Sequence, residues 1–265
     1  MNKVLPFIFL VQLLISCSFT DTAHGDMALD NGCQSCVDDT ITPIKPADFI
    51  DSITMRYDTM LGDCRQLFVV FNAKASSVVS ELQVYELGDG GWVAVDSLVC
   101  PCNVGRNGIA PYGTKVEGDG KTPTGIFSIT HFFSKHPSFA SRLEKISVTR
   151  NTVWVDDPND PLYNSYCEQD PAHPKKGERL IRNDAQYDYA MVINYNTKER
   201  VPRKGSAIFF HVWTRPGSGT AGCVAVDEAN ILRLLGWIDA DKHPMIIIGS
   251  LEDEGIFHIE GTKYQ

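Results

Sequence analysis

The sequence predicts a mainly β domain over residues 65–250, with a few short helices. Three observations support this fold class. Apolar runs of strand length recur from residue 66 onward, and only two segments show the apolar spacing of a helix. The composition is globular, with 43% hydrophobic and 22% charged residues. A chain of 265 residues is long enough to bury a substantial core.

The first residues predict export. Residues 4–15 form an apolar run that is shorter than the roughly 20 residues needed to cross a bilayer and that matches the core of a secretory signal peptide. The run ends in Leu14-Ile15-Ser16-Cys17, which resembles the motif at which bacterial lipoproteins are cleaved and lipidated. We therefore expect residues 1–16 to be a signal peptide and Cys17 to carry a lipid. Ordinary cleavage after Gly25 is the alternative.

Residues 17–64 are predicted to form a polar linker that ends in a short helix. The formal net charge of the chain is −9, and this segment holds nine Asp against Lys45 and Arg56. The acidity therefore belongs mainly to the linker rather than to the domain. Near its end, apolar side chains recur at helical spacing, at Ile50, Ile53, Tyr57 and Leu61.

The domain itself is expected over residues 65–250, followed by a tail over 251–265. Its strands are predicted where apolar or alternating segments occur, at residues 67–71, 82–86, 92–95, 152–155, 189–193, 207–210 and 245–248. One clear helix begins after Asp227, a favourable N-cap. Its apolar face is formed by Ile231, Leu234, Leu235 and Ile238.

The eight cysteines point to a reactive thiol. If Cys17 carries lipid, seven cysteines remain, and in an oxidising compartment an odd number leaves one thiol unpaired. We take this thiol to be Cys223. The other six are expected to form structural disulfides of undetermined connectivity, rather than a zinc or redox site, because their spacing is not that of a zinc ribbon. They are Cys33, Cys36, Cys64, Cys100, Cys102 and Cys167.

The string Gly118-Asp119-Gly120-Lys121-Thr122-Pro123-Thr124-Gly125 resembles a phosphate-binding loop at first sight. That motif requires a glycine where this chain has Lys115, and an exported protein meets little ATP. Its Gly, Asp and Pro residues are typical of two tight turns at the surface. A surface loop accounts for the turns but not for the whole string.

A histidine and a cysteine provide the elements of nucleophilic catalysis. His211 ends an apolar strand, and Cys223 follows a glycine-rich turn. A cysteine nucleophile needs a base close enough to take its proton, and a neighbouring strand can supply one. The amides of Ala221, Gly222 and Cys223 could point at one oxyanion. The alternative is a buried structural cysteine beside a histidine of the core.

These elements together resemble the L,D-transpeptidase catalytic domain, the family of YkuD-like cysteine transpeptidases, in a bacterial lipoprotein branch. The resemblance rests on Lys115 to Phe127, His211 and Thr220-Ala221-Gly222-Cys223-Val224-Ala225-Val226, and it covers roughly residues 67–249. Residues 154–158 and Tyr195-Asn196 also resemble stretches of one branch. It implies a mainly β fold, a sandwich or barrel, and attack on peptidoglycan stem peptides between an L-centre and a D-residue.

The resemblance assigns roles residue by residue. It implies that Cys223 is the nucleophile, that His211 is the base and that the backbone carbonyl of Val212 orients the imidazole. The amides of Ala221, Gly222 and Cys223 match the oxyanion hole of the family. No cofactor and no metal are implied, and the remaining histidines offer no spacing for a metal site.

Two departures from the family pattern concern substrate binding. The common pattern has a second histidine where this chain has Ala221, and an arginine where it has Ala225. Arg215 or Arg203 is a candidate replacement for that arginine, and Thr220 is a further candidate for substrate binding.

We therefore expect an exported cysteine acyltransferase of the bacterial cell envelope, periplasmic and lipid-anchored. Its expected partner is the peptidoglycan stem peptide; the charge shows no basic cluster for nucleic acid. Sequence does not choose between transfer of the acyl group to an amine and its hydrolysis by an L,D-carboxypeptidase. A non-catalytic wall-binding lipoprotein on the same fold is a third alternative, and the joint presence of Cys223 and His211 argues against it.

Overall fold

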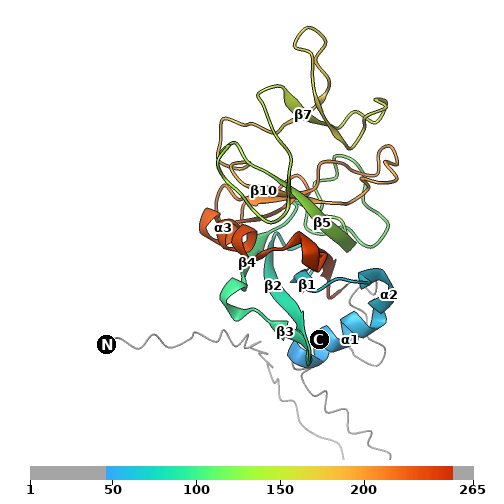
Figure 1. Ribbon diagram of the computed structural model, residues 1–265. Coiled ribbons are helices and arrows are strands. Elements are labelled where there is room, and N and C mark those ends of the chain that lie inside the picture. The colour runs from blue at the N-terminus through green and yellow to red at the C-terminus, as the bar shows by residue number, and fades with distance from the viewer. Residues whose placement is uncertain (1–45, 253–265) are drawn as a thin grey trace, which may run out of the picture. The chain divides into compact units, whose positions relative to one another are not determined.

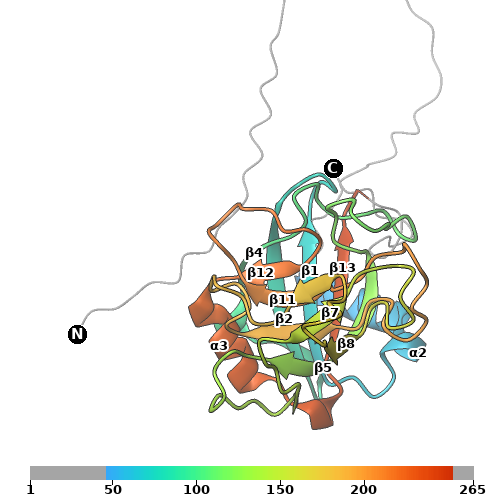
Figure 2. The ribbon, with the colours of Figure 1, turned by 90° about the horizontal axis from the view of Figure 1, so that it is seen from above.

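Eight strands pair in a ring in the computed structural model, which describes residues 46–252 (Figures 1 and 2). The ring runs β1-β13-β5-β10-β11-β12-β4-β2 and closes because β2 also pairs with β1. Two short strands, β3 and β6, extend it from β2 and β5. The predicted signal peptide, the lipid site at Cys17, Cys33, Cys36 and most of the tail lie outside the described residues.

The strands of this sheet, in chain order, are β1 (Gln66–Asn72), β2 (Val79–Gly88), β3 (Gly91–Ala94), β4 (Cys100–Asn103), β5 (Gly125–Phe133), β6 (Glu144–Lys145), β10 (Ala190–Ile193), β11 (Phe209–Val212), β12 (Val224–Val226) and β13 (Met245–Ser250). A second, three-stranded sheet has the order β8-β7-β9, and its strands are β7 (Thr152–Val155), β8 (Tyr166–Glu168) and β9 (Gly177–Arg179).

Few helices accompany the strands. They are α1 (Pro46–Arg56), α2 (Asp58–Leu61), α3 (Glu228–Trp237) and the single 3₁₀ turns η1 (Asp96–Leu98) and η2 (Ala240–Lys242). The mainly β prediction is confirmed. Within residues 46–252, no helix has the length and the apolar character that a bilayer crossing needs.

Alternate residues of the barrel strands face two different cores, because successive side chains of a strand point to opposite sides. Met191, Phe210 and Val224 belong to the large core, which also holds the apolar face of α3. Phe209 and Cys223, on the other side of β11 and β12, belong to a smaller core that they share with Trp154 of β7. In Figure 1, β7 lies beyond β10, on the far side from β1.

The two helices predicted from spacing are present. Asp227 caps α3, and its Oδ1 accepts a hydrogen bond from the Asn230 amide at 2.8 Å. The helix predicted within residues 47–61 appears as α1 and α2. Ile50 and Ile53 of α1 are each 1% exposed and pack in one cluster with Leu67 of β1.

Two sequence predictions differ from the structure. The strand predicted from residue 207 begins only at Phe209, because Ala207 takes a left-handed conformation with φ of 53° that a strand ladder does not accept. No disulfide joins any of the cysteines between residues 46 and 252, where Cys64, Cys100, Cys102 and Cys167 are free thiols. The disulfides expected among these four are therefore not found.

Candidate active site

Cys223 and His211 come from neighbouring parallel strands. In the pairing of β11 with β12, Phe210 is opposite Val224 and His211 is opposite Ala225. Cys223 precedes β12 by one residue, so its side chain lies on the same side as Ala225 and His211. Both side chains are buried, with Cys223 5% and His211 4% exposed. The strand register therefore brings the predicted nucleophile and base to one face.

Backbone groups hold the thiol of Cys223. The Phe209 amide donates to its Sγ at 3.3 Å, and Sγ donates to the Ala207 carbonyl at 3.4 Å. Burial raises the pKa of the Cys223 thiol to about 12, and the negative charge of Glu178 raises it too, while the Phe209 amide opposes the shift. The resting sulfur is consequently a neutral thiol.

The imidazole of His211 is held in one tautomer. Its Nδ1 lies 2.8 Å from the Val212 carbonyl, which can only accept, so Nδ1 carries the hydrogen and Nε2 has the free lone pair. Burial lowers the pKa of His211 to about 4, although the bond to Val212 acts in the opposite direction. The Tyr187 ring packs edge-on against the imidazole, with centroids 5.3 Å apart. A neutral, oriented imidazole of this kind can accept a proton.

The turn before Cys223 is tied together by two threonine hydroxyls. Thr220 Oγ1 donates to the Cys223 carbonyl at 2.7 Å and accepts from the Gly222 amide at 3.1 Å. Thr122 Oγ1 donates to the same carbonyl at 3.2 Å. The amides of Ala221 and Cys223 donate to no atom within the described part of the chain, so these two remain available to an oxyanion.

The glycine-rich string upstream supports this turn. Its Asp119 carboxylate accepts from the Val116 amide at 3.0 Å and from the Lys121 amide at 2.9 Å, and it pairs with the buried Lys115 at 2.7 Å. A Cβ on Gly222, whose φ is 153°, would lie 2.9 Å from the Lys121 carbonyl oxygen. The string therefore packs directly under the Gly222 backbone, and only glycine fits this close approach.

A second hydrogen-bond network fixes Ala207, whose carbonyl accepts from the Cys223 thiol. Asn164 Oδ1 accepts from the Ala207 amide at 3.0 Å and from Trp154 Nε1 at 2.9 Å. Ala207 and Asn164 both have positive φ, 53° and 55°, a conformation that costs energy for residues other than glycine. Such strain is concentrated at functional sites, where the surrounding structure holds it in place.

Comparison with known proteins now decides the family. The family model of the L,D-transpeptidase catalytic domain, YkuD, matches residues 77–251. The chain belongs to this family. A search of curated proteins found no match.

One solved structure also resembles this L,D-transpeptidase-family chain. It is the crystal structure of the helical cell shape determining protein Pgp2 from Campylobacter jejuni, which aligns with 75% of the chain at 15% sequence identity and a TM-score of 0.37. The alignment covers 56% of that protein's chain. At this level the likeness says nothing about the chemistry of the site.

The site residues that were predicted from the sequence fall into two groups in the structure. Cys223, His211 and Val212 lie together on the paired strands β11 and β12, and Ala221 lies in the turn that leads to Cys223. Gly222 and Thr220 lie in the same turn, but there the Gly222 amide and the Thr220 hydroxyl are bonded to each other. Arg203 and Arg215 are exposed, and no contact with Cys223 or His211 is found for either side chain among the described residues.

Four charged or polar side chains that act on Cys223 or His211 were not predicted from the sequence to belong to the site. Glu178 and Lys115 both act electrostatically on the Cys223 thiol, and the Tyr187 hydroxyl donates to Glu178. The Arg182 guanidinium lies 5.1 Å over the Tyr187 ring, and its charge acts on both Cys223 and His211. The nearest of them along the chain, Tyr187, lies 36 positions before Cys223, so no sequence spacing identifies them.

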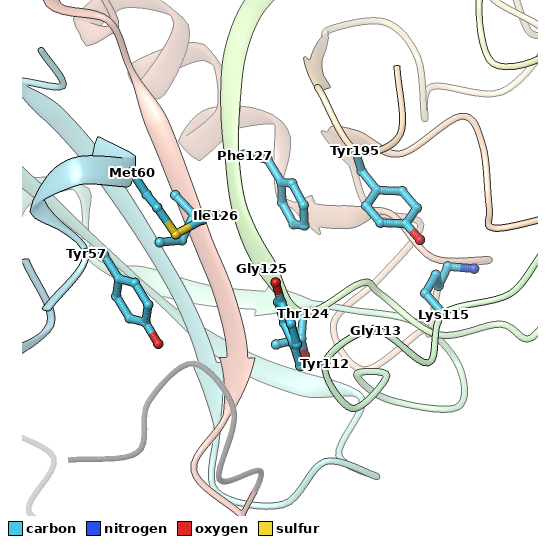
Figure 3. A pocket seen from close by; sticks show the side chains of 10 residues that line it. All are labelled: Tyr57, Met60, Tyr112, Gly113, Lys115, Thr124, Gly125, Ile126, Phe127 and Tyr195. Atoms are coloured by element: carbon cyan, nitrogen blue, oxygen red, sulfur yellow. The ribbon is translucent and has the colours of Figure 1, made fainter. Parts of the chain in front are cut away.

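Three cavities of the domain lie outside the pair itself, because neither Cys223 nor His211 is among their lining residues. One of about 500 Å³ is lined by Lys115 and by aromatic side chains, and Figure 3 shows Phe127 and Tyr195 adjacent within it. A second, of about 670 Å³, is lined by charges of both signs, among them Asp156 and Lys176. The third, of about 650 Å³, is lined by Arg150, Arg179 and Arg182. Among the described residues, no three potential metal-ligating side chains cluster together.

Proposed function

We propose that this protein is an exported L,D-transpeptidase. It breaks the peptide bond between the third residue and the D-residue at position four of a peptidoglycan stem, and it passes the acyl group to an amine. The observation that supports the proposal most directly is the arrangement on β11 and β12. There a buried thiol, an imidazole with a free Nε2 and two unused amides lie together.

Acylation begins from a neutral pair, because the thiol and the imidazole are both uncharged near pH 7. His211 Nε2 takes the thiol proton as Cys223 Sγ attacks the carbonyl carbon of the third residue. The S–C bond forms, and the carbonyl oxygen becomes an oxyanion that accepts from the amides of Ala221 and Cys223. The C–N bond then breaks, and His211 returns the proton to the departing amine of the D-residue.

The second half of the reaction resolves the thioester. An acceptor amine attacks the carbonyl carbon, His211 takes the amine proton, the C–S bond breaks and the sulfur takes a proton again. Water in the same position gives a free tripeptide instead, which is the L,D-carboxypeptidase outcome. Ala221 and Ala225 supply no polar side chain to hold an acceptor, so we expect some hydrolysis to accompany transfer.

We also propose that the protein acts in the periplasm, anchored by a lipid on Cys17. The support is the apolar run of residues 4–15 and the motif that ends at Cys17. Changing Cys17→Ser should release the mature protein from membranes or leave it unprocessed. Unchanged fractionation together with an unchanged mature mass would contradict the anchor.

The experiment for the activity uses a purified disaccharide tetrapeptide at rising concentration, with products identified by mass spectrometry. We expect a dimer joined between third-position residues, together with released D-residue and some tripeptide. Tripeptide alone at every concentration would replace the transferase by the carboxypeptidase. No product of either kind, with folded protein, would favour the non-catalytic wall-binding alternative.

A further inference from the structure

The resting thiol of Cys223 lies against a strained segment of backbone, residues 205–207. Its Sγ donates to the Ala207 carbonyl at 3.4 Å, and Ala207 has a left-handed φ of 53°. Within residues 46–252, no hydrogen bond joins this sulfur to the His211 imidazole. The strained segment therefore places the resting sulfur, and other contacts must hold Ala207 in a conformation that costs energy.

The side chain of Asn164, in the turn between β7 and β8, holds Ala207. Its Oδ1 accepts from the Ala207 amide at 3.0 Å and from Trp154 Nε1 at 2.9 Å, and its Nδ2 donates to the Tyr195 carbonyl at 3.0 Å. Both lone pairs of the oxygen are used, so these donors fix the orientation of the amide. Asn164 is 1% exposed and itself has a φ of 55°, which asparagine tolerates better than most residues.

The preceding residue, Tyr163, holds the start of the same segment. Its hydroxyl accepts from the Gly205 amide at 3.2 Å and donates to Glu117 Oε2 at 2.6 Å. The Ser206 hydroxyl donates to the same carboxylate oxygen at 2.8 Å. Each residue of the segment 205–207 is thus bonded to a side chain from a distant part of the chain.

Tyr163 and Asn164 are placed to act on the thiol through the backbone rather than on a substrate. Both side chains are buried, and neither lines any of the three cavities described above. Their bonds end at the segment 205–207, whose last carbonyl accepts from the thiol. A change at either residue should therefore alter where the sulfur lies and leave the substrate-binding surface intact.

We propose that Tyr163 and Asn164 form a clamp that positions the Cys223 thiol for attack, by holding the Ala207 carbonyl against it. This inference rests on the proposed function, because it takes Cys223 as the nucleophile, and it adds two positioning residues to that site. A hydrogen bond donated by the neutral thiol favours the protonated form. Opening the clamp should consequently make the sulfur easier to ionise but worse placed for the reaction.

The substitution Asn164→Gly tests the clamp, because glycine accepts the left-handed backbone and only the amide is lost. We expect kcat for the disaccharide tetrapeptide to fall about tenfold or more with KM unchanged. Alkylation of Cys223 by iodoacetamide at pH 9 should become several-fold faster. The matched control is His243→Gly, an exposed left-handed residue at the end of η2 with a φ of 46°. It should change neither rate.

A conservative variant and a second position separate the clamp from general support of the fold. Asn164→Asp keeps an oxygen acceptor and should retain most of kcat, whereas Tyr163→Phe removes one hydroxyl and should shift both rates in the direction of Asn164→Gly. Thermal melting reports folding, and Tyr163→Phe takes over the test if Asn164→Gly does not fold. A lower melting temperature with native kcat and native alkylation would overturn the clamp.

Alkylation needs no turnover, so failure of the clamp and failure of the proposed function are distinguishable. Faster alkylation of Asn164→Gly, in a protein whose native form does not process the tetrapeptide, would support the clamp and contradict the proposed function. Native turnover of the tetrapeptide by Asn164→Gly, with unchanged alkylation, would do the reverse.

Discussion

Two regions meet at the proposed active site, and they position their residues in different ways. The nucleophile platform, formed by β11, β12 and the turn 220–223, is buried and holds Cys223 and His211 by backbone groups. The segment from Glu178 to Tyr187 beside it acts through charged side chains, several of which reach solvent. In the proposed mechanism the reacting atoms are therefore placed by main-chain geometry, whereas charged side chains of another segment act on them electrostatically.

Removing the sulfur gives the largest effect expected on the nucleophile platform. Cys223→Ala should abolish both transfer and hydrolysis, because in the proposed mechanism both run through a thioester on this sulfur. The fold should survive, since a small side chain merely replaces one thiol. Product formation is measured by mass spectrometry and folding by thermal melting. Turnover by a folded Cys223→Ala protein would falsify the assignment of the nucleophile.

Removing the base should cost less than removing the sulfur. His211→Ala should lower kcat/KM by about 10²-fold or more, the usual contribution of a positioned base. In the native enzyme the acid limb of the pH–rate profile should lie near pH 4 rather than 6.5, because burial lowers the pKa of His211. An acid limb at the ordinary histidine value would show that the imidazole is solvated in the working enzyme.

A glycine substitution separates backbone geometry from side-chain chemistry. Gly222→Ala introduces a Cβ 2.9 Å from the Lys121 carbonyl at a φ of 153°, so it should displace the turn and lower activity by about tenfold or more. Gly236→Ala in α3, where a Cβ meets nothing within 4 Å, is the matched control. It should leave activity unchanged and raise stability by roughly 0.5–1 kcal/mol. Equal effects of the two changes would mean that the turn does not control the chemistry.

The smallest expected effect comes from changing Glu178, in the segment from Glu178 to Tyr187. The negative charge of Glu178 raises the pKa of the Cys223 thiol, so Glu178→Gln should lower that pKa and increase the thiolate fraction at a given pH. Alkylation of Cys223 by iodoacetamide at pH 9 should become several-fold faster. Glu199→Gln, at an exposed position, should not alter the rate. No acceleration in the Glu178→Gln protein would mean that the carboxylate is too well screened to influence the thiol.

The sequence identified the residues of the nucleophile platform as candidates because they lie in two local patterns, and the structure places them on paired strands. His211 lies at the end of an apolar run and Cys223 follows a glycine-rich turn, and the resemblance to the family singled out both. The sequence could not predict that the segment from Glu178 to Tyr187 belongs to the site. Its side chains reach the site only because β9 pairs with β7 and the Tyr187 ring packs on Phe209. For the same reason the sequence pointed to Arg215 and Arg203, whose exposed side chains make no contact with Cys223 or His211 among the described residues.

The sequence also could not predict where the glycine-rich string, residues 118–125, packs in the fold. Its turns were expected from Gly118 and Gly120, but its contact with Gly222 depends on side chains and backbone that lie about 100 residues apart. The strands β5 and β12 were not predicted as such, although both lie in the ring of the barrel. β12 is a three-residue strand buried on both faces, so it carries no alternation of apolar and polar residues. β5 has nine residues of mixed burial, so neither a continuous apolar run nor a regular alternation marks it.

The central claim is that Cys223 forms a thioester with the third residue of a stem peptide. It is tested most directly by intact-protein mass spectrometry after rapid mixing with a disaccharide tetrapeptide and acid quenching. The account predicts a mass increase equal to the donor minus its D-residue, located on the Cys223 peptide and absent from Cys223→Ala. Turnover with no adduct on Cys223 at any time, or an adduct that persists in Cys223→Ala, would contradict it.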